Sequence, residues 1–141
     1  MDILNLYQEL IIDHGTKPNN HRILENPTHT SEGYNPLCGD RIKLYLKIEK
    51  NRIQDACFKG SGCAISTASA SIMTDMLKGK TQLEALTLFK NFKDLVTSSS
   101  DKEPTHELGK LLALSGVKVF PSRIKCATLV WHALNDALKT R

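Results

Sequence analysis

The sequence predicts an α+β fold, in which a small antiparallel β-sheet of about three strands carries helices packed on one face. Two observations predict this class. Residues 41–49 alternate between apolar and polar side chains, which is the pattern of a half-buried strand. Beyond the glycine-flanked stretch 60–62, apolar residues recur every three or four positions, which is the spacing of amphipathic helices.

The N-terminal quarter is expected to hold one helix followed by turns. Apolar side chains recur at helical spacing through residues 2–14, and Gly15 follows as a stop signal. Residues 16–35 contain the proline and asparagine clusters that are typical of turns, with room for a short strand near Thr30–Tyr34.

The alternating stretch defines the first long strand and its two faces. The side chains expected on the core face are Ile42, Leu44, Leu46 and Ile48, and the opposite face is expected to be wet. Lys50-Asn51 turns the chain, and residues 52–59 return as a second strand. In that strand Ala56 and Phe58 are expected to point away from the face of Ile53 and Cys57.

The second half of the chain reads as helices. A stripe from Ile65 to Met76 predicts one helix, and Thr81 with Glu84 forms a capping-box pattern that starts the next. Residues 97–104 are polar and predict a loop, and residues 107–114 predict a short helix that ends at Ser115-Gly116. The last helix is expected from about Ser122.

Length and composition limit the classes of protein that this chain can belong to. At 141 residues it is expected to form one domain over residues 1–141. The net charge of +4 is spread along the chain, which argues against a nucleic-acid partner. No apolar run approaches the roughly 20 residues that span a membrane, and no leader pattern is seen, so a cytoplasmic protein with reduced cysteines is expected.

Three short stretches each place a cysteine at a turn or near the start of an expected helix. Cys38 is followed by Gly39 and Asp40, Cys63 follows a glycine loop, and Cys126 is expected in the first turn of the last helix. Helix N-termini favour a thiolate at Cys63 and Cys126, and Arg123 and Lys125 add positive charge beside Cys126. Three thiolates and one carboxylate complete the ligand set of a tetrahedral metal ion. We therefore expect Cys38, Asp40, Cys63 and Cys126 to share one metal site.

The remaining chemistry-bearing residues favour structural roles. Cys57 lies within the second strand without an acidic neighbour in the pattern, so packing is expected. His14 and His132 fall in helical patterns, and the five histidines show no paired metal spacing. The sequence has no nucleophile elbow, Walker loop or dinucleotide glycine motif.

Five motifs follow one another along the chain: Asp13-His14-Gly15, Cys38-Gly39-Asp40, Asp55-Ala56-Cys57-Phe58, Gly62-Cys63-Ala64-Ile65-Ser66 and the run from Phe120 to Leu129. With these motifs the whole chain resembles the IscU/NifU N-terminal family of iron–sulfur cluster assembly proteins. Two features are similar to its SufU branch: Lys125 stands where scaffold-type members usually carry a histidine, and residues around 97–116 look like an insertion.

The resemblance implies a zinc-dependent sulfurtransferase that acts with a SufS-type cysteine desulfurase. Cys38, on the glycine-flanked turn, is the expected catalytic nucleophile, because it is the ligand most easily released from the metal. It would accept persulfide sulfur and pass it to a downstream iron–sulfur scaffold or a small thiol.

The ligand types alone leave other functions open. Thiolates suit an iron–sulfur cluster as well as zinc, so a scaffold that assembles a transient [2Fe–2S] cluster on Cys38, Asp40, Cys63 and Cys126 is the alternative. A purely structural zinc module would usually show paired C-x-x-C knuckles, and a zinc hydrolase would need an open coordination position with a general base nearby. The sequence has no such knuckle, and the four expected ligands would fill a tetrahedral site.

Overall fold

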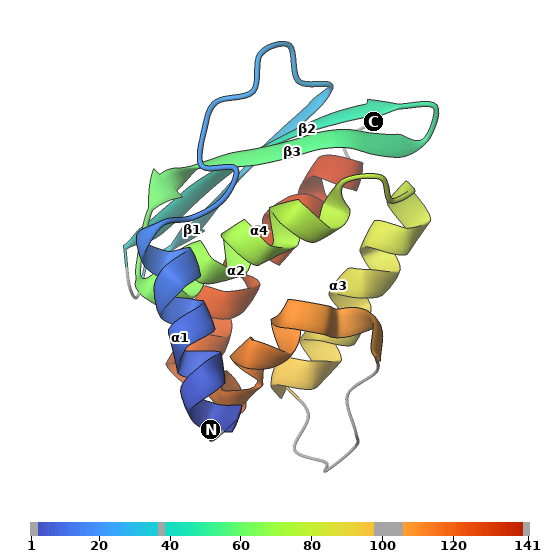
Figure 1. Cartoon of the computed structure of the whole chain (residues 1–141). Helices are drawn as coiled ribbons and strands as arrows, with labels where there is room; N and C mark the ends of the chain where they lie inside the picture. Colours follow the sequence, from blue (N-terminus) through green and yellow to red (C-terminus); the bar gives the residue numbers. More distant parts are fainter. Residues whose placement is uncertain (1–2, 37–38, 98–105, 140–141) are drawn as a thin grey trace.

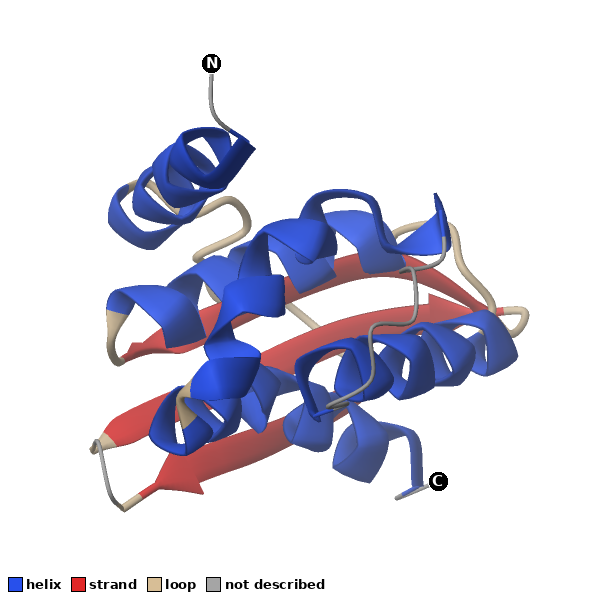
Figure 2. Ribbon diagram, turned by 90° about the horizontal axis from the view of Figure 1, so that it is seen from below, coloured by secondary structure: helices blue, strands red, loops and turns tan. Residues whose placement is uncertain are grey.

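The computed structural model of the chain describes residues 3–36, 39–97 and 106–139. The three strands form one layer, and the helices lie together against one face of the sheet (Figures 1 and 2), which confirms the predicted fold class. In chain order the elements are α1 (Ile3–Thr16), β1 (His29–Asn35), β2 (Asp40–Glu49), β3 (Arg52–Ser61), α2 (Ala64–Leu77), α3 (Gln82–Thr97), the 3-10 helical segment η1 (His106–Val119), which is interrupted at Gly109, and α4 (Pro121–Lys139).

The sheet is fully antiparallel in the order β1-β2-β3. Lys50 and Asn51 join β2 to β3 with φ angles of 52° and 65°, the left-handed pair that a two-residue hairpin needs. The expected orientation of Ile53 was wrong. The register shifts between Lys47 and Ile48, so Ile53 pairs with Ile48 and is fully buried in the same core as Ala56 and Phe58.

The core lies between the sheet and the helical layer. Leu44, Leu46 and Phe58 from the strands are buried in one cluster with Trp131 of α4 and Phe92 of α3. The predicted capping box is confirmed, because the Thr81 and Glu84 side chains each accept the other's backbone N–H, at 3.1 and 2.9 Å. None of the helices in the described part of the chain is long and apolar enough to cross a membrane.

The alternation predicted that the opposite face of the sheet is exposed to solvent, but part of that face is buried. Tyr45 and Cys57 pair across β2 and β3 and are buried there with Leu24 in a second, small apolar cluster. The segment between α1 and β1 lies against β3, since the Phe58 N–H donates to the Asn20 carbonyl at 3.0 Å.

Three helix boundaries differ from the sequence prediction. Gly15 lies inside α1, and a Cβ there would come within 3.1 Å of Ala64, so glycine allows α1 to approach the start of α2. Helical structure continues past Ser115-Gly116 to Val119. The last helix begins at Pro121, so Cys126 lies in its second turn rather than its first.

Candidate metal centre

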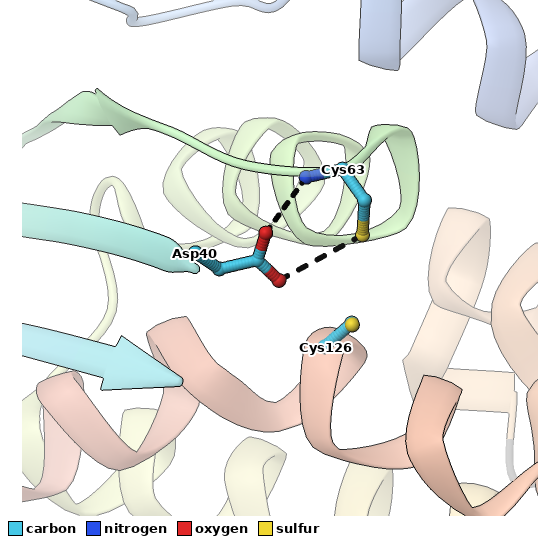
Figure 3. A group of neighbouring side chains, drawn as sticks. All are labelled: Asp40, Cys63 and Cys126. Atoms are coloured by element: carbon cyan, nitrogen blue, oxygen red, sulfur yellow. Dashed lines mark hydrogen bonds between the residues drawn. The ribbon is translucent and has the colours of Figure 1, made fainter. Parts of the chain in front are cut away.

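Asp40 is the first residue of β2, and it is buried at the end of the strand that lies near the start of α2. Its Oδ1 accepts the backbone N–H of Cys63 at 2.8 Å, and its Oδ2 lies 3.8 Å from the Cys63 Sγ (Figure 3). The carboxylate therefore joins the start of β2 to the start of α2.

Cys63 is the N-cap residue of α2. Its backbone is extended, and its Sγ accepts the N–H of Ser66 at 3.4 Å, so the sulfur lies over the first turn of the helix. The unpaired N–H groups and the dipole of a helix N-terminus favour negative charge at this point. The preceding Gly62 is needed for close approach, because a Cβ there would come within 2.7 Å of the Asp40 Oδ1.

Cys126 approaches the same point from α4 and is fully buried. The Asn35 side chain at the end of β1 donates to its sulfur at 4.0 Å. Because Cys126 lies in the second turn of α4, it is beyond the unpaired N–H groups that the sequence prediction invoked. Its sulfur is held instead by burial and by the Asn35 amide.

The three side chains converge in space (Figure 3). One ligand atom from each of Asp40, Cys63 and Cys126 lies within 4.8 Å of the other two. Two ligands on a tetrahedral zinc ion stand roughly 3.5 Å apart, which is close to the 3.8 Å between the Asp40 Oδ2 and the Cys63 Sγ. Two soft sulfurs and a carboxylate thus fit a thiophilic ion such as zinc or iron.

Of the three remaining predicted site residues, one is not described and two lie outside the cluster. Cys38 is outside the described residues, so the fourth expected ligand has no structural counterpart in Figure 3. Arg123 and Lys125 are exposed on the first turns of α4. Arg123 lines a groove beside α1 and α2, whereas Lys125 lines a shallow pocket next to Asn35 and Pro36.

Two residues near the cluster escaped the sequence prediction. Asn35 is buried and contacts the Cys126 sulfur, yet its only sequence signal was its position just before Pro36. Ser66 is fully buried in the first turn of α2, three residues after Cys63, and in the sequence it stood out only as the last residue of a family motif. That these two residues lie near the cluster can be seen only in the folded structure.

Cys57 is buried in packing, as expected, but it does have an acidic neighbour. Its sulfur lies 3.9 Å from the Asp55 Oδ1, and burial, followed by the Asp55 charge, raises the pKa of this thiol. A raised pKa keeps Cys57 protonated and unreactive.

The helical histidines have structural contacts. The buried His14 shares a 2.6 Å hydrogen bond between its Nδ1 and the Ser71 Oγ, and burial lowers its pKa. His132 packs edge-on against Phe89, and burial lowers its pKa as well.

Comparisons with known proteins agree with this geometry. Residues 6–127 match the family described as the NifU-like N-terminal domain. The chain is 45% identical over 133 residues to the zinc-dependent sulfurtransferase SufU of Bacillus subtilis, covering 94% of this chain and 89% of that protein. It is 42% identical over 135 residues to a protein of Streptococcus pyogenes named iron–sulfur cluster assembly scaffold protein IscU, covering 96% and 84%.

A solved structure shows the same fold. The putative iron–sulfur cluster assembly scaffold protein for the SUF system from Fervidobacterium islandicum superposes with a TM-score of 0.86 at 37% identity, covering 93% of this chain and 95% of that one.

A three-stranded sheet under a helical layer, with a carboxylate and two cysteines gathered where β2, α2 and α4 meet, defines an α+β protein with a thiol-rich cluster that could hold a metal ion. The chain belongs to the NifU-like N-terminal domain family, and it is an iron–sulfur cluster assembly protein of the IscU/SufU type.

Proposed function

We propose that this protein is a zinc-dependent sulfurtransferase that accepts sulfur from a cysteine desulfurase. The observation that carries the proposal is the firm anchoring of the three described ligands. Cys63 and Cys126 are fixed on helices, and Asp40 is fixed on β2 by the Cys63 N–H. Cys38 precedes Gly39, an exposed residue with a φ of 71°, in the turn that leads into β2.

In this proposal Asp40, Cys63 and Cys126 hold the metal while Cys38 completes the set and is released for chemistry. Bound zinc would keep the thiolates ionised at neutral pH and protect them from oxidation. The helix N-terminus at Cys63 and the Asn35 amide at Cys126 offset part of the negative charge that these ligands bring.

The transfer step is a thiolate–persulfide exchange. The Cys38 thiolate attacks the terminal sulfur of the donor persulfide, forming a new S–S bond on Cys38 while the donor's S–S bond breaks. The electron pair of the broken bond leaves with the donor cysteine as a thiolate. No external oxidant or reductant is consumed, because the sulfane sulfur carries its oxidation state with it. A second exchange passes the sulfur to a scaffold protein or a small thiol.

A groove beside the cluster suits the desulfurase as the docking partner. It has a volume of about 710 Å³, and Ala64 and Ile65, which follow Cys63 directly, form part of its wall. Its lining is mainly apolar, with Phe120 60% exposed at its edge, and Arg123 is the only charged residue among the described ones that line it. We infer that the desulfurase segment bearing the persulfide places apolar side chains here and an acidic group against Arg123.

Another part of the groove's wall comes from η1, through residues such as Ala113 and Ser115. This is the stretch that resembles an insertion specific to the SufU branch. A partner face built partly from that stretch supports a SufS-type desulfurase as the donor.

The second candidate function is a scaffold that builds a [2Fe–2S] cluster on the same residues. The relative named IscU and the thiolate ligands both favour it. Lys125 argues for transfer, because a protonated lysine has no lone pair for a metal and its side chain lines a pocket outside the ligand cluster.

The test measures desulfurase turnover with trace zinc-loaded protein, excess cysteine and a thiol reductant. Many sulfide equivalents per copy, abolished in Cys38→Ala, are expected from a sulfurtransferase. Cys57→Ala is the matched control and should retain turnover, because Cys57 lies on the other face of the sheet. Little stimulation, together with a stable cluster once iron is supplied, would establish the scaffold function instead.

A further inference from the structure

Ser66 has an unusual environment for a buried polar residue. It is fully buried in the first turn of α2, and its Oγ has no hydrogen-bond partner among the described residues. An unsatisfied buried hydroxyl destabilises a fold, so one that persists in a native structure calls for a physical explanation. Other serines of the same helix are satisfied: the Ser71 Oγ, for example, bonds to both the His14 Nδ1 and the Asn19 N–H.

The cap of α2 does not use the Ser66 hydroxyl. With Cys63 as N-cap, Ser66 occupies the third helical position, from which a Glu or Gln side chain would reach back to the N-cap N–H. That N–H is already taken by the Asp40 Oδ1 at 2.8 Å. The carboxylate therefore satisfies the N-cap N–H, and the Ser66 hydroxyl has no part in the cap.

The Cys63 sulfur lies over the turn that carries Ser66. Because Cα–Cβ bonds of an α-helix tilt toward its N-terminus, the Ser66 side chain leaves the backbone toward the end that carries Cys63. The Cys63 Sγ lies over this turn, 3.4 Å from the Ser66 nitrogen. A neutral thiol is a weak acceptor, whereas a thiolate is a strong one. The Ser66 side chain makes no hydrogen bond with the described residues of this structure, so it is free to rotate about χ1 and donate to such a thiolate.

We propose that Ser66 is a positioning residue whose hydroxyl donates to the Cys63 sulfur when that sulfur is held as a thiolate by a bound metal. The inference rests on the proposed metal site. Without metal the hydroxyl is unsatisfied and destabilises the fold; with metal it is satisfied and stabilises the ionised ligand. Ser66 thus favours the loaded state over the empty one.

The test compares Ser66→Ala with Ser71→Ala, a matched control on the same helix that removes a satisfied buried hydroxyl. Two quantities are measured: the melting temperature of the metal-free protein, and the zinc affinity by competition with a chromophoric chelator. Ser66→Ala is expected to leave the metal-free melting temperature unchanged or higher and to weaken zinc binding by roughly tenfold, as loss of an outer-shell hydrogen bond does. Ser71→Ala should lower the melting temperature and leave the affinity unchanged.

Cobalt gives a second readout that a purely structural role would not move. The sulfur-to-cobalt charge-transfer band should shift to lower energy in Ser66→Ala, because the sulfur loses a donor, and should stay in place in Ser71→Ala. Unchanged zinc affinity with an unshifted band in Ser66→Ala would overturn the inference.

Cys63→Ser separates this outcome from failure of the proposed site. If Cys63→Ser also leaves zinc binding intact, the ligand set itself is wrong. If Cys63→Ser loses zinc while Ser66→Ala binds it normally, only the role of Ser66 is refuted.

Discussion

At the scale of single residues, the centre depends on a contact that leaves no room for a side chain. Gly62 lies between β3 and the N-cap of α2, where a Cβ would come within 2.7 Å of the Asp40 Oδ1 and 3.1 Å of its carboxyl carbon. Asp40 is held there by the Cys63 N–H, so it cannot retreat without losing that hydrogen bond. Glycine at this position therefore sets the distance between the carboxylate and the Cys63 sulfur.

Gly62→Ala should accordingly weaken zinc binding by at least tenfold while changing the melting temperature of the metal-free protein only modestly. The added methyl displaces the carboxylate, one of the three clustered ligands, but it lies in an exposed loop outside the core. Gly116→Ala is the control, because a Cβ there meets nothing within 4 Å. Equal zinc affinities in the two variants, measured by chelator competition, would refute this account of Gly62.

Residue chemistry could be predicted from the sequence where a local pattern marks it. Asp40 and Cys63 sit beside glycines at the edges of periodic segments, and in the structure the Asp40 Oδ2 lies 3.8 Å from the Cys63 Sγ. Asn35 and Ser66 carry no such mark. Their roles depend on which sulfur lies opposite them, and that depends on how α4 and α2 pack.

At the scale of elements, α1 is attached to the rest of the helical layer largely through α2. The His14 side chain reaches Ser71 of α2 at 2.6 Å. The asparagines that follow α1 continue this attachment, since the Asn19 and Asn20 side chains each donate to Asp75, at 2.6 and 2.8 Å. A buried imidazole within this contact makes the docking of α1 dependent on its protonation.

Stability should therefore fall in mildly acidic solution, in part because of His14. Burial, followed by the Lys110 charge, lowers its pKa below 6.5, against the opposing charges of Asp75 and Asp13. The contribution of neutral His14 to the unfolding free energy is complete well above pH 6.5, where this residue is neutral in both the folded and the unfolded chain. It is lost as the pH falls below 6.5 toward the lowered value, because the unfolded chain binds the proton first.

Urea unfolding of the metal-free protein at pH 7.5 and pH 5.5 tests this effect. The drop in unfolding free energy between the two pH values should be smaller in His14→Asn than in the wild type. The exposed His21 provides the control, and His21→Asn should show the wild-type drop. An unchanged drop in His14→Asn would mean that this histidine does not report on α1 docking.

The prediction of strands and helices was right where a local sequence pattern determines the element. It was wrong where strand register or helix packing determines it. The alternation of β2 and the capping box of α3 are local patterns, and both are present. The orientation of Ile53 was wrong because a register shift adds one residue to β3, and such shifts leave no trace in composition. The predicted end of α1 was wrong because Gly15 allows close packing on Ala64 and does not terminate the helix.

At the scale of the whole molecule, the centre exists only when distant parts of the chain are folded together. Asp40 comes from the start of β2, Cys63 from the cap of α2 and Cys126 from α4, 86 and 63 residues from its partners in the sequence. The Asn35 contact adds the end of β1. An unfolded chain cannot present these ligands together, so metal binding and folding must be coupled.

Metal removal should thus destabilise the entire fold. Zinc at one hundred times its dissociation constant adds about 2.7 kcal/mol to the stability of the folded state. For a chain of this length that corresponds to roughly 5–10 °C in melting temperature. Scanning calorimetry with and without a strong chelator measures the shift, and Cys126→Ser, which lacks one buried ligand, should show little of it. Chelator-independent melting in the wild type, or an equal shift in Cys126→Ser, would contradict a site built from these three elements.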